Sequence, residues 1–567
     1  MYTQVLAPVG DSLFLSSLIA VLPLLTLFVL LGGLRLRAWV AALVALAVAI
    51  VVAVAVYSMP VAQAALAATE GAAFGFFPIM WIVINAIWIY NMTVKTGHFD
   101  VLRRSFASVS DDQRIQAVII AFCFGALLEA LAGFGTPVAI TAVMLIALGF
   151  KPIKAATVAL VANTAPVAFG ALAVPIITLS TVTSAVTPLS VDHLGSLVGR
   201  QTPILAVFVP LVLVFIVDGR RGVRQTWPAA LVCGITFGIG QFASSNYFSV
   251  PLADIVAALL AAAVLVGFLR IWHPADSYRE GSQTGAPVVA GGAADQPTAE
   301  FSKNLDRPDS KADILRAYSP YLIIIAIFGL ANIPAIKGTA PLKPGETGTG
   351  LHSVTRIVQW PGLHLFNAKG KPLSLVNYKL DWLIAAGTLL LIAGLITMLV
   401  LRVRPGTAIR VYGATLDQLK FAILTVMAVL ALAYVMNASG QTATLGNWMA
   451  GAGAAFALLS PVLGWLGVAV TGSDTSSNSL FGALQVTAAA KAHLDPGLMA
   501  AGNSSGGVLG KMISPQNLAI AAAAVGLAGR EGEGELFRKV FGWSVLLLVV
   551  MCLIVFLQST SVLGWMV

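Results

Sequence analysis

A polar tract set between two apolar runs carries the residue types best suited to chemistry in this chain. It reads Thr-Gly-Ser-Asp-Thr-Ser-Ser-Asn over 471–478, between apolar runs at 451–469 and 480–490. Hydrocarbon offers no partner for free backbone groups, so such a tract at membrane depth must line a cavity or be buried in protein. It places one carboxylate, Asp474, among hydroxyls and an amide, and intramembrane ionisable residues are functional candidates by default. An ordinary solvent loop between two helices is the alternative interpretation.

A second interruption lies at Gly-Phe-Gly-Thr-Pro, residues 133–137, between apolar runs at 115–132 and 138–150. The second run has about 13 residues, fewer than the ~20 that a membrane span needs, and basic residues flank both runs. We therefore expect a re-entrant hairpin over 115–150, with Glu129 one turn before its tip. Glycine tolerates unusual dihedrals and proline removes a donor, which suits a tip at membrane depth. The expected tip residues of this hairpin and of a second one over 448–490 are Gly133, Gly135, Pro137 and Gly472.

The composition places these tracts in a membrane protein. Of 567 residues, 58% are hydrophobic and only 10% are charged, whereas soluble proteins have about 25% charged residues. The spacing of the apolar runs predicts an all-α polytopic protein of about 12 transmembrane helices plus two re-entrant hairpins. The net charge of +9 comes from Lys and Arg beside spans, where they fix orientation, so no nucleic-acid partner is implied. The three cysteines lie inside apolar runs without metal-ligand spacing, which indicates no metal and no cofactor.

Charge beside the spans predicts the topology. Arg35 and Arg37 end the first apolar run and are expected in the cytoplasm, so the N-terminus lies outside, and the alternation of later spans leaves the C-terminus outside as well. Residues 273–316 are rich in Gly, Ala, Pro, Ser and charge, which predicts a flexible cytoplasmic linker. Residues 337–379 form a large outer segment.

An internal repeat relates the two halves of the chain. Asn163-Thr164 followed by Gly170 and Pro175 matches Asn503-Ser504 followed by Gly510 and Pro515 at identical spacings. The matches fall in two broken spans, 155–184 and 498–529, each just after a hairpin, and the predicted hairpins enter from opposite sides. That is the inverted-topology repeat of secondary transporters, whose sites lie where broken helices of both halves meet. A chance match is the alternative. The predicted units are residues 1–217 (first repeat), 218–272 (connecting helix pair), 273–316 (linker) and 317–567 (second repeat).

Four motifs, at 132–137, 163–170, 471–478 and 506–517, resemble the L-lactate permease family over essentially the whole chain. The resemblance implies a multi-pass protein of the bacterial plasma (inner) membrane that imports L-lactate, D-lactate or glycolate together with protons. A wider likeness to ion-transporter folds implies that two hairpin tips and two unwound helices enclose the substrate. Homodimers and elevator-type movement are implied by that wider likeness only.

A 2-hydroxy monocarboxylate presents one carboxylate and one hydroxyl. Half-helix N-termini suit the anion, and hydroxyl and amide side chains can bind the remaining groups. The substrate-binding candidates are Thr136, Asn163, Thr164, Ser473, Thr475, Ser476, Asn478, Asn503, Ser504 and Ser505. Lys511 could add a cation to the site or could instead reach to a membrane interface.

Proton coupling needs a group whose charge changes between the two faces of the membrane. Asp474, with Glu129 in reserve, is the candidate, although either carboxylate could instead be a permanently paired structural charge.

Three other functions remain as alternatives. A sodium-coupled dicarboxylate carrier or other organic-anion carrier would be distinguished by sodium dependence. An anion channel fits less well, because broken inverted repeats around one polar site suit alternating access. An enzyme would need an acid/base or metal constellation, and the sequence shows none of the common motifs.

Overall fold

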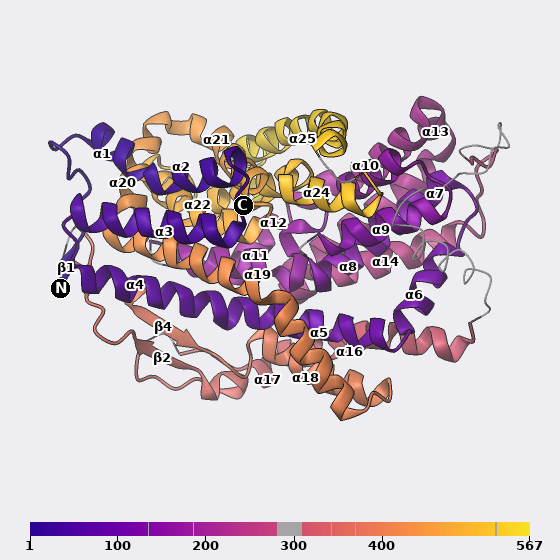
Figure 1. Ribbon diagram of the computed structural model, residues 1–567, viewed down its shortest axis with the longest axis horizontal. Coiled ribbons are helices and arrows are strands. Elements are labelled where there is room, and N and C mark those ends of the chain that lie inside the picture. Colours follow the sequence, from indigo (N-terminus) through magenta and orange to yellow (C-terminus); the bar gives the residue numbers. More distant parts are fainter. Residues whose placement is uncertain (134, 185, 280–308, 342, 369, 528–529) are drawn as a thin grey trace.

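The protein is built almost entirely of apolar helices (Figure 1). The computed structural model describes residues 1–133, 135–184, 186–279, 309–341, 343–368, 370–527 and 530–567. In this part of the chain ten helices are long and apolar enough to cross a membrane, or up to eleven if one bent pair is a single span. The predicted all-α polytopic fold is confirmed, while the exact topology and the repeat stay predictions. Phe134 of the first tip and residues 280–308 of the predicted linker lie outside the described residues.

The first predicted hairpin has two helical arms that pack against each other. One arm comprises α7 (Gln113–Gln116), a π-helical segment (Ala117–Phe124) and α8 (Gly125–Ala132). The other arm is α9 (Thr136–Ala147). Between them Gly135 has φ +83°, a left-handed conformation that favours glycine. The 12 residues of α9 extend about 18 Å at 1.5 Å per residue, too little to cross ~30 Å of hydrocarbon.

The second hairpin consists of α21 (Phe456–Thr471) and α22 (Asp474–Lys491), which also pack together. Gly472, with φ +75°, reverses the chain between them. The Ser473 hydroxyl then accepts the Ser476 N–H and caps α22. Asp474 is therefore the first helical residue, where an acidic side chain suits the positive end of the helix dipole.

Each hairpin is followed by a broken helix. In the first, α10 (Pro152–Ala162) and a helical segment over 167–183 that contains α11 (Gly170–Thr183) meet at 63°. The residues 171–173 have φ of 46°, 55° and 60°, three consecutive left-handed positions without glycine, which L-residues disfavour. In the second, α23 (Pro496–Gly510) and α24 (Pro515–Ala524) are separated by a short turn over 511–514.

The two halves of the chain interlock through these four units. The first broken helix packs on the second hairpin through α11 and α22, and the second broken helix packs on the first hairpin through α24 and α9. Each hairpin thus contacts the broken helix of the opposite half as well as that of its own half.

A second group of helices, called the scaffold helices here, flanks this assembly (Figure 1). It comprises α3 (Ala38–Ala55), α4 (Val61–Phe74), α5 (Trp81–Lys95), α18 (Ala386–Val400) and α19 (Pro405–Ser439). The long α19 packs on α3 and α4, and α18 packs on α5. A Cβ on Gly71 would lie 2.6 Å from the Leu430 carbonyl oxygen, so only glycine allows α4 and α19 to approach this closely.

A long bent helix lies beside the first hairpin. Helix α13 (Thr202–Ala243) bends at Asp218 and Gly219, where the charges predicted a return to the cytoplasm, and α14 (Ala253–Phe268) packs against it and against α8. The remaining helices are α1 (Leu13–Ala20), α2 (Leu22–Phe28), α6 (His98–Ala107), α12 (Val191–Val198), α16 (Lys311–Asn332), α17 (Pro334–Lys337), α20 (Gln441–Met449) and α25 (Arg530–Gln558).

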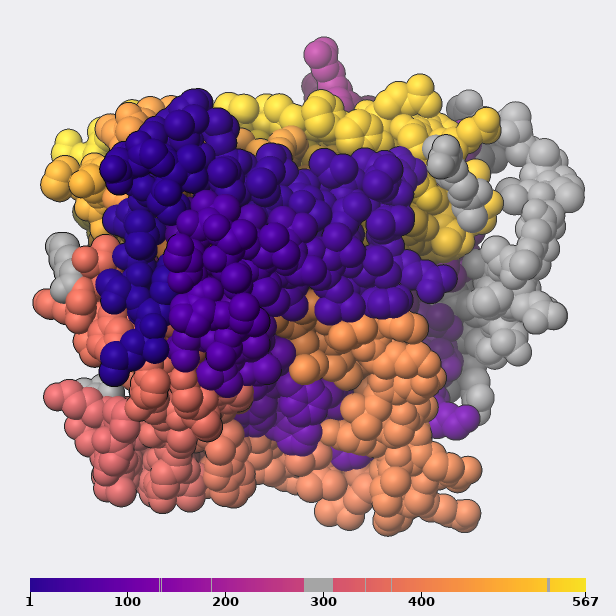
Figure 2. Space-filling view, turned by 60° about the vertical axis from the view of Figure 1, so that its left-hand side comes forward, coloured from indigo at the N-terminus to yellow at the C-terminus, as the bar shows by residue number. Residues whose placement is uncertain are grey.

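Four short strands form two small sheets in and around the predicted outer segment. Strand β1 (Tyr2–Thr3) pairs in parallel with β3 (Leu365–Phe366), and β2 (Arg356–Gln359) pairs antiparallel with β4 (Asn377–Leu380). Figure 2 shows the indigo N-terminal residues against this segment. The N-terminus and residues 337–379 therefore lie together, as expected for two segments predicted on the same side.

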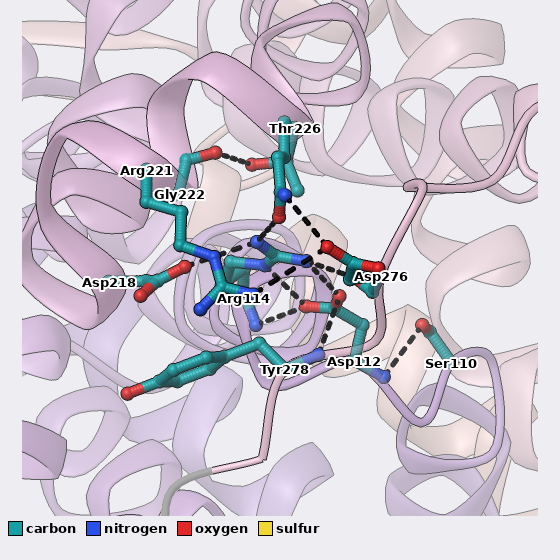
Figure 3. Close-up of polar contacts among 10 residues, drawn as sticks. Ser110, Asp112, Arg114, Asp218, Arg221, Gly222, Thr226, Asp276 and Tyr278 are labelled. Atoms are coloured by element: carbon teal, nitrogen blue, oxygen red, sulfur yellow. Dashed lines mark hydrogen bonds and ion pairs between the residues drawn. The ribbon is translucent and has the colours of Figure 1, made fainter.

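Buried Arg114, at the base of the first hairpin, joins that hairpin to α13 (Figure 3). Its guanidinium pairs with Asp112 at 2.7 Å and with Asp218 at 3.1 Å. It also donates to Gln225 Oε1 and to the Asp276 carbonyl oxygen, each at 2.5 Å. The Tyr278 ring lies 5.7 Å from the guanidinium carbon. Removing one partner of such a buried charge network is strongly destabilising, so these contacts fix the hairpin base to the bend of α13.

Candidate functional site

A cavity of about 130 Å³ lies where both hairpin tips, both broken helices and the scaffold helices meet. It is smaller than the roughly 300 Å³ at which pockets for drug-sized ligands begin, so it suits a small solute. Gly133 and Gly472 of the two tips both line it. Its charged and hydrogen-bonding side chains are Glu129, Thr425, Thr471, Ser473, Asp474, Thr475, Ser476, Lys511 and Gln516.

The ion pair in this cavity joins the two halves of the chain. Lys511 Nζ lies 2.5 Å from Glu129 Oε1, and the two side chains are only 8% and 4% exposed. Asn163 Nδ2 donates to the other carboxylate oxygen of Glu129 at 2.9 Å. Glu129 comes from the first hairpin, Asn163 from the first broken helix and Lys511 from the second. Lys511 therefore points into the site rather than toward a membrane interface.

Asp474 is the second carboxylate of the cavity. It forms no ion pair among the described residues, although Lys511 is close enough to interact with it electrostatically. Ser504 Oγ donates to its Oδ2 at 2.6 Å, and Asn478 Nδ2 approaches the same oxygen at 3.4 Å. The other oxygen, Oδ1, is buried and has no hydrogen-bond partner among the described residues. Buried polar groups nearly always have partners, and because Oδ1 packs against Gly507, this oxygen is a place for a proton rather than for a ligand.

A chain of amides behind the cavity supports Asp474. Asn503 Nδ2 donates to Asn478 Oδ1 at 2.8 Å, and Gln485 Nε2 donates to Asn503 Oδ1 at 3.0 Å. Asn478 also donates to Ser504 Oγ and to the Pro175 carbonyl oxygen, both at 3.1 Å. Asn478, Asn503 and Ser504 do not line the cavity themselves; they hold Asp474 from behind.

Three further predicted binding residues neither line the cavity nor make a described hydrogen bond to its carboxylates. Thr136 begins α9 outside the cavity lining. The Thr164 hydroxyl donates to the Val161 carbonyl oxygen, and Ser505 Oγ donates to Gln201 Oε1 at 2.6 Å. Of the remaining tip residues, Gly135 packs against the Ile520 side chain of α24, and Pro137 lies in the first turn of α9.

Two fully buried carboxylates were not singled out from the sequence. Asp254 in α14 accepts from Gln241 Nε2 at 2.9 Å through Oδ1, while its Oδ2 has no partner among the described residues. It is close enough to interact electrostatically with Glu129 and Lys511. Glu70 in α4 has no described hydrogen-bond partner on either oxygen. Asp254 could have been identified from the sequence as a single acidic residue at the start of an apolar run, which is unusual in a membrane helix.

Among the described residues, no group of three or more His, Cys, Asp or Glu side chains could hold a metal ion. The side chains of the cavity offer one paired cation, two carboxylates, five hydroxyls and one amide, that of Gln516. Such a lining can bind a small anion and can hold a proton, but it contains no arranged nucleophile and base.

Comparisons with known proteins identify the family. The family model described as L-lactate permease matches residues 16–562. The chain is 41% identical to the L-lactate permease of Bacillus subtilis over the full length of both proteins. It is 42% identical to the glycolate permease GlcA of Escherichia coli, over 100% of this chain and 99% of that protein. The structure of MtrF from Neisseria gonorrhoeae, described as an antimetabolite efflux pump, aligns with a TM-score of 0.48 and 11% identity, over 87% of this chain and 82% of that one. Because the family model covers nearly the whole chain and these relatives match it from end to end, the protein belongs to the L-lactate permease family.

Proposed function

We propose that this protein is a secondary active transporter that imports L-lactate and related 2-hydroxy monocarboxylates, including glycolate and D-lactate, with protons across the bacterial inner membrane. The observation that carries the proposal is the small cavity enclosed by two hairpin tips and two broken helices, with a cation and two carboxylates in its lining. The names of the relatives, lactate and glycolate permeases, support this substrate class.

The substrate anion has two sources of positive potential in the cavity. Lys511 supplies an ammonium group, which it shares with Glu129, and α22 begins at the cavity wall, where the positive end of its dipole favours an anion. We expect the hydroxyls of Thr471 and Ser476 and the amide of Gln516, which line the cavity, to bind the 2-hydroxyl group.

Charge balance explains why a proton would accompany the anion. Glu129 already neutralises Lys511, so a bound lactate would add an unpaired negative charge to a buried site beside Asp474. Unpaired charge in such surroundings is strongly unfavourable. If one carboxylate takes up a proton as the anion binds, the net charge of the site is unchanged. Lactate and proton would then move together as a neutral pair.

The arrangement of the surface segments supports the proposed orientation, with both termini outside. Arg200 Nη1 donates to the Met566 carbonyl oxygen near the C-terminus, and Lys337 pairs with Asp192 at 3.6 Å. These contacts group the C-terminus, the segment around 192–200 and the predicted outer segment. The predicted cytoplasmic segments form a separate group, with Arg104 paired to Asp309 at 2.7 Å.

Uptake of labelled lactate into proteoliposomes tests the function. An inward proton gradient should drive accumulation. A membrane potential alone, worth about 2.3 kcal/mol per charge per 100 mV, should not, because the pair carries no net charge. Internal unlabelled lactate should accelerate uptake if the protein is a carrier and should not if it is a channel. Accumulation driven by a sodium gradient at equal pH would contradict proton coupling and favour the sodium-coupled carrier.

Gly507→Ala should sharply reduce lactate uptake without loss of folded protein. Gly507 in α23 faces Asp474, and a Cβ at this position would collide with Asp474 Oδ1, so the carboxylate must move from its place in the cavity. Gly267→Ala in α14 is the matched control, because a Cβ there meets nothing within 4 Å. Equal uptake by both variants would show that the position of Asp474 is not important for transport.

A further inference from the structure

A second, larger cavity adjoins the candidate site. Its volume is about 650 Å³, and five residues belong to the lining of both cavities: Ala38, Ala422, Thr425, Thr471 and Gln516. Two arginines, Arg35 and Arg37, line the larger cavity and not the smaller one. We call this larger cavity the basic vestibule, and the five shared residues its neck.

The two arginines of the basic vestibule differ in their partners. Arg35 pairs with Glu533 of α25 at 3.4 Å, and the two side chains are 53% and 21% exposed. Such an exposed pair contributes little to stability, but it neutralises one of the two cations. The exposed Arg37 side chain makes no hydrogen bond or ion pair with any residue that the structure describes. Its charge is therefore available to a ligand in the basic vestibule.

The walls of the basic vestibule strengthen the effect of that charge. Trp39 and Phe421 stack with ring centroids 5.8 Å apart and both line the cavity. Walls of low polarity around charges of one sign focus the electric field and raise the local concentration of counter-ions. The lining of the neck combines the small side chains of Ala38 and Ala422 with the hydroxyl of Thr425. An anion attracted by Arg37 would thus meet hydrogen-bonding groups on the way to Lys511.

We propose that the basic vestibule is the access route of the monocarboxylate on its face of the membrane, and that Arg37 is the cation that gathers the anion there. This inference rests on the proposed function and names the route and a residue that the substrate site itself does not contain. In the orientation predicted from the charges, this face is cytoplasmic. Arg37 would then act on substrate binding and release at the inner side, without contacting the substrate while it is bound beside Lys511.

Charge-selective labelling of the neck tests the route without measuring transport. Thr425→Cys introduces a thiol there, while the native Cys123, Cys233 and Cys552 are all buried. Reaction rates with an anionic and a cationic methanethiosulfonate reagent of similar size are compared at low ionic strength. Adding Arg37→Gln should lower the anionic-to-cationic rate ratio by roughly threefold to tenfold, and salt well above 0.1 M should remove most of the difference. Adding Arg37→Lys should keep the ratio close to that of Thr425→Cys alone.

An arginine that lies outside both cavities provides the control for Arg37→Gln. Arg410 is exposed on α19, the helix that also carries Thr425, and it lines neither cavity. Arg410→Gln should therefore leave the ratio of the two labelling rates unchanged. A ratio that Arg37→Gln does not alter would overturn the assignment of Arg37. A Thr425→Cys thiol that reacts with neither reagent would overturn the access route.

A transport measurement separates this inference from the proposed function. In inside-out vesicles Arg37→Gln should raise the KM for lactate severalfold at low salt with little change in the maximal rate. In right-side-out vesicles the KM should stay near that of the wild type. If the wild-type protein moves no lactate in either orientation, the proposed function fails, whereas equal KM values for wild type and variant from both faces contradict only the inference about Arg37.

Discussion

Lys511→Met is expected to abolish lactate uptake and to destabilise the protein by about 3–5 kcal/mol. The substitution removes the cation of the cavity and leaves Glu129 buried with only Asn163 as a described hydrogen-bond partner. An uncompensated buried charge is far less favourable than the intact pair or a neutral replacement of similar volume. Thermal unfolding in detergent and uptake into proteoliposomes measure the two effects separately.

A double variant separates folding from transport at this pair. Lys511→Met with Glu129→Gln replaces both charges, so much of the lost stability should return while uptake remains absent. Lys95→Met is the matched control, because Lys95 is an exposed lysine at the end of α5. Wild-type uptake by Lys511→Met would show that the cation of the cavity plays no part in binding the substrate.

Asp474→Asn is expected to abolish lactate accumulation under a proton gradient while exchange of labelled for unlabelled lactate continues. Asparagine keeps nearly the shape of the side chain and can still accept the hydrogen bond from Ser504 Oγ. It cannot bind and release a proton, so it removes net coupled movement, whereas exchange needs no net proton movement. Asp417→Asn is the control, since the Asp417 side chain is 77% exposed on α19.

Unchanged lactate accumulation by Asp474→Asn would show that Asp474 has a structural role only. If Asp474→Asn accumulates lactate as the wild type does, Glu129→Gln is the next variant, followed by Asp254→Asn. Asp254 is tested as well because its Oδ2 has no hydrogen-bond partner among the described residues and because it interacts electrostatically with Glu129 and Lys511. Normal accumulation by all three variants would mean that the proton travels on another group or that the substrate crosses as neutral lactic acid.

The hairpins and the broken helices could be predicted because their determinants are local. The short arm after residue 137, the glycines at both tips and the prolines after the breaks limit the backbone wherever they occur. The pairing of Glu129 with Lys511 could not be predicted, because 382 residues separate them and only the packing of the opposite halves brings them together.

The matched asparagines show the same limit. Asn163 and Asn503 occupy equivalent places in the predicted repeat, yet Asn163 binds Glu129 and Asn503 binds Asn478. The repeat relates backbone positions, whereas the partner of a side chain is decided by the residues that a neighbouring helix presents. In one half that neighbour supplies a carboxylate and in the other an amide.

The contacts of Arg114 have a consequence for the predicted linker. Asp276 and Tyr278, which precede residues 280–308, are fixed to Arg114, and Asp309, which follows them, is fixed to Arg104. The residues on both sides of 280–308 are thus anchored to one short stretch of chain, 104–114. The entropy of closing a flexible loop grows only with the logarithm of its length, at about 0.6 kcal/mol per doubling. Insertions and deletions at this place should therefore change the length of the chain with little effect on the stability of the helices that line the candidate site.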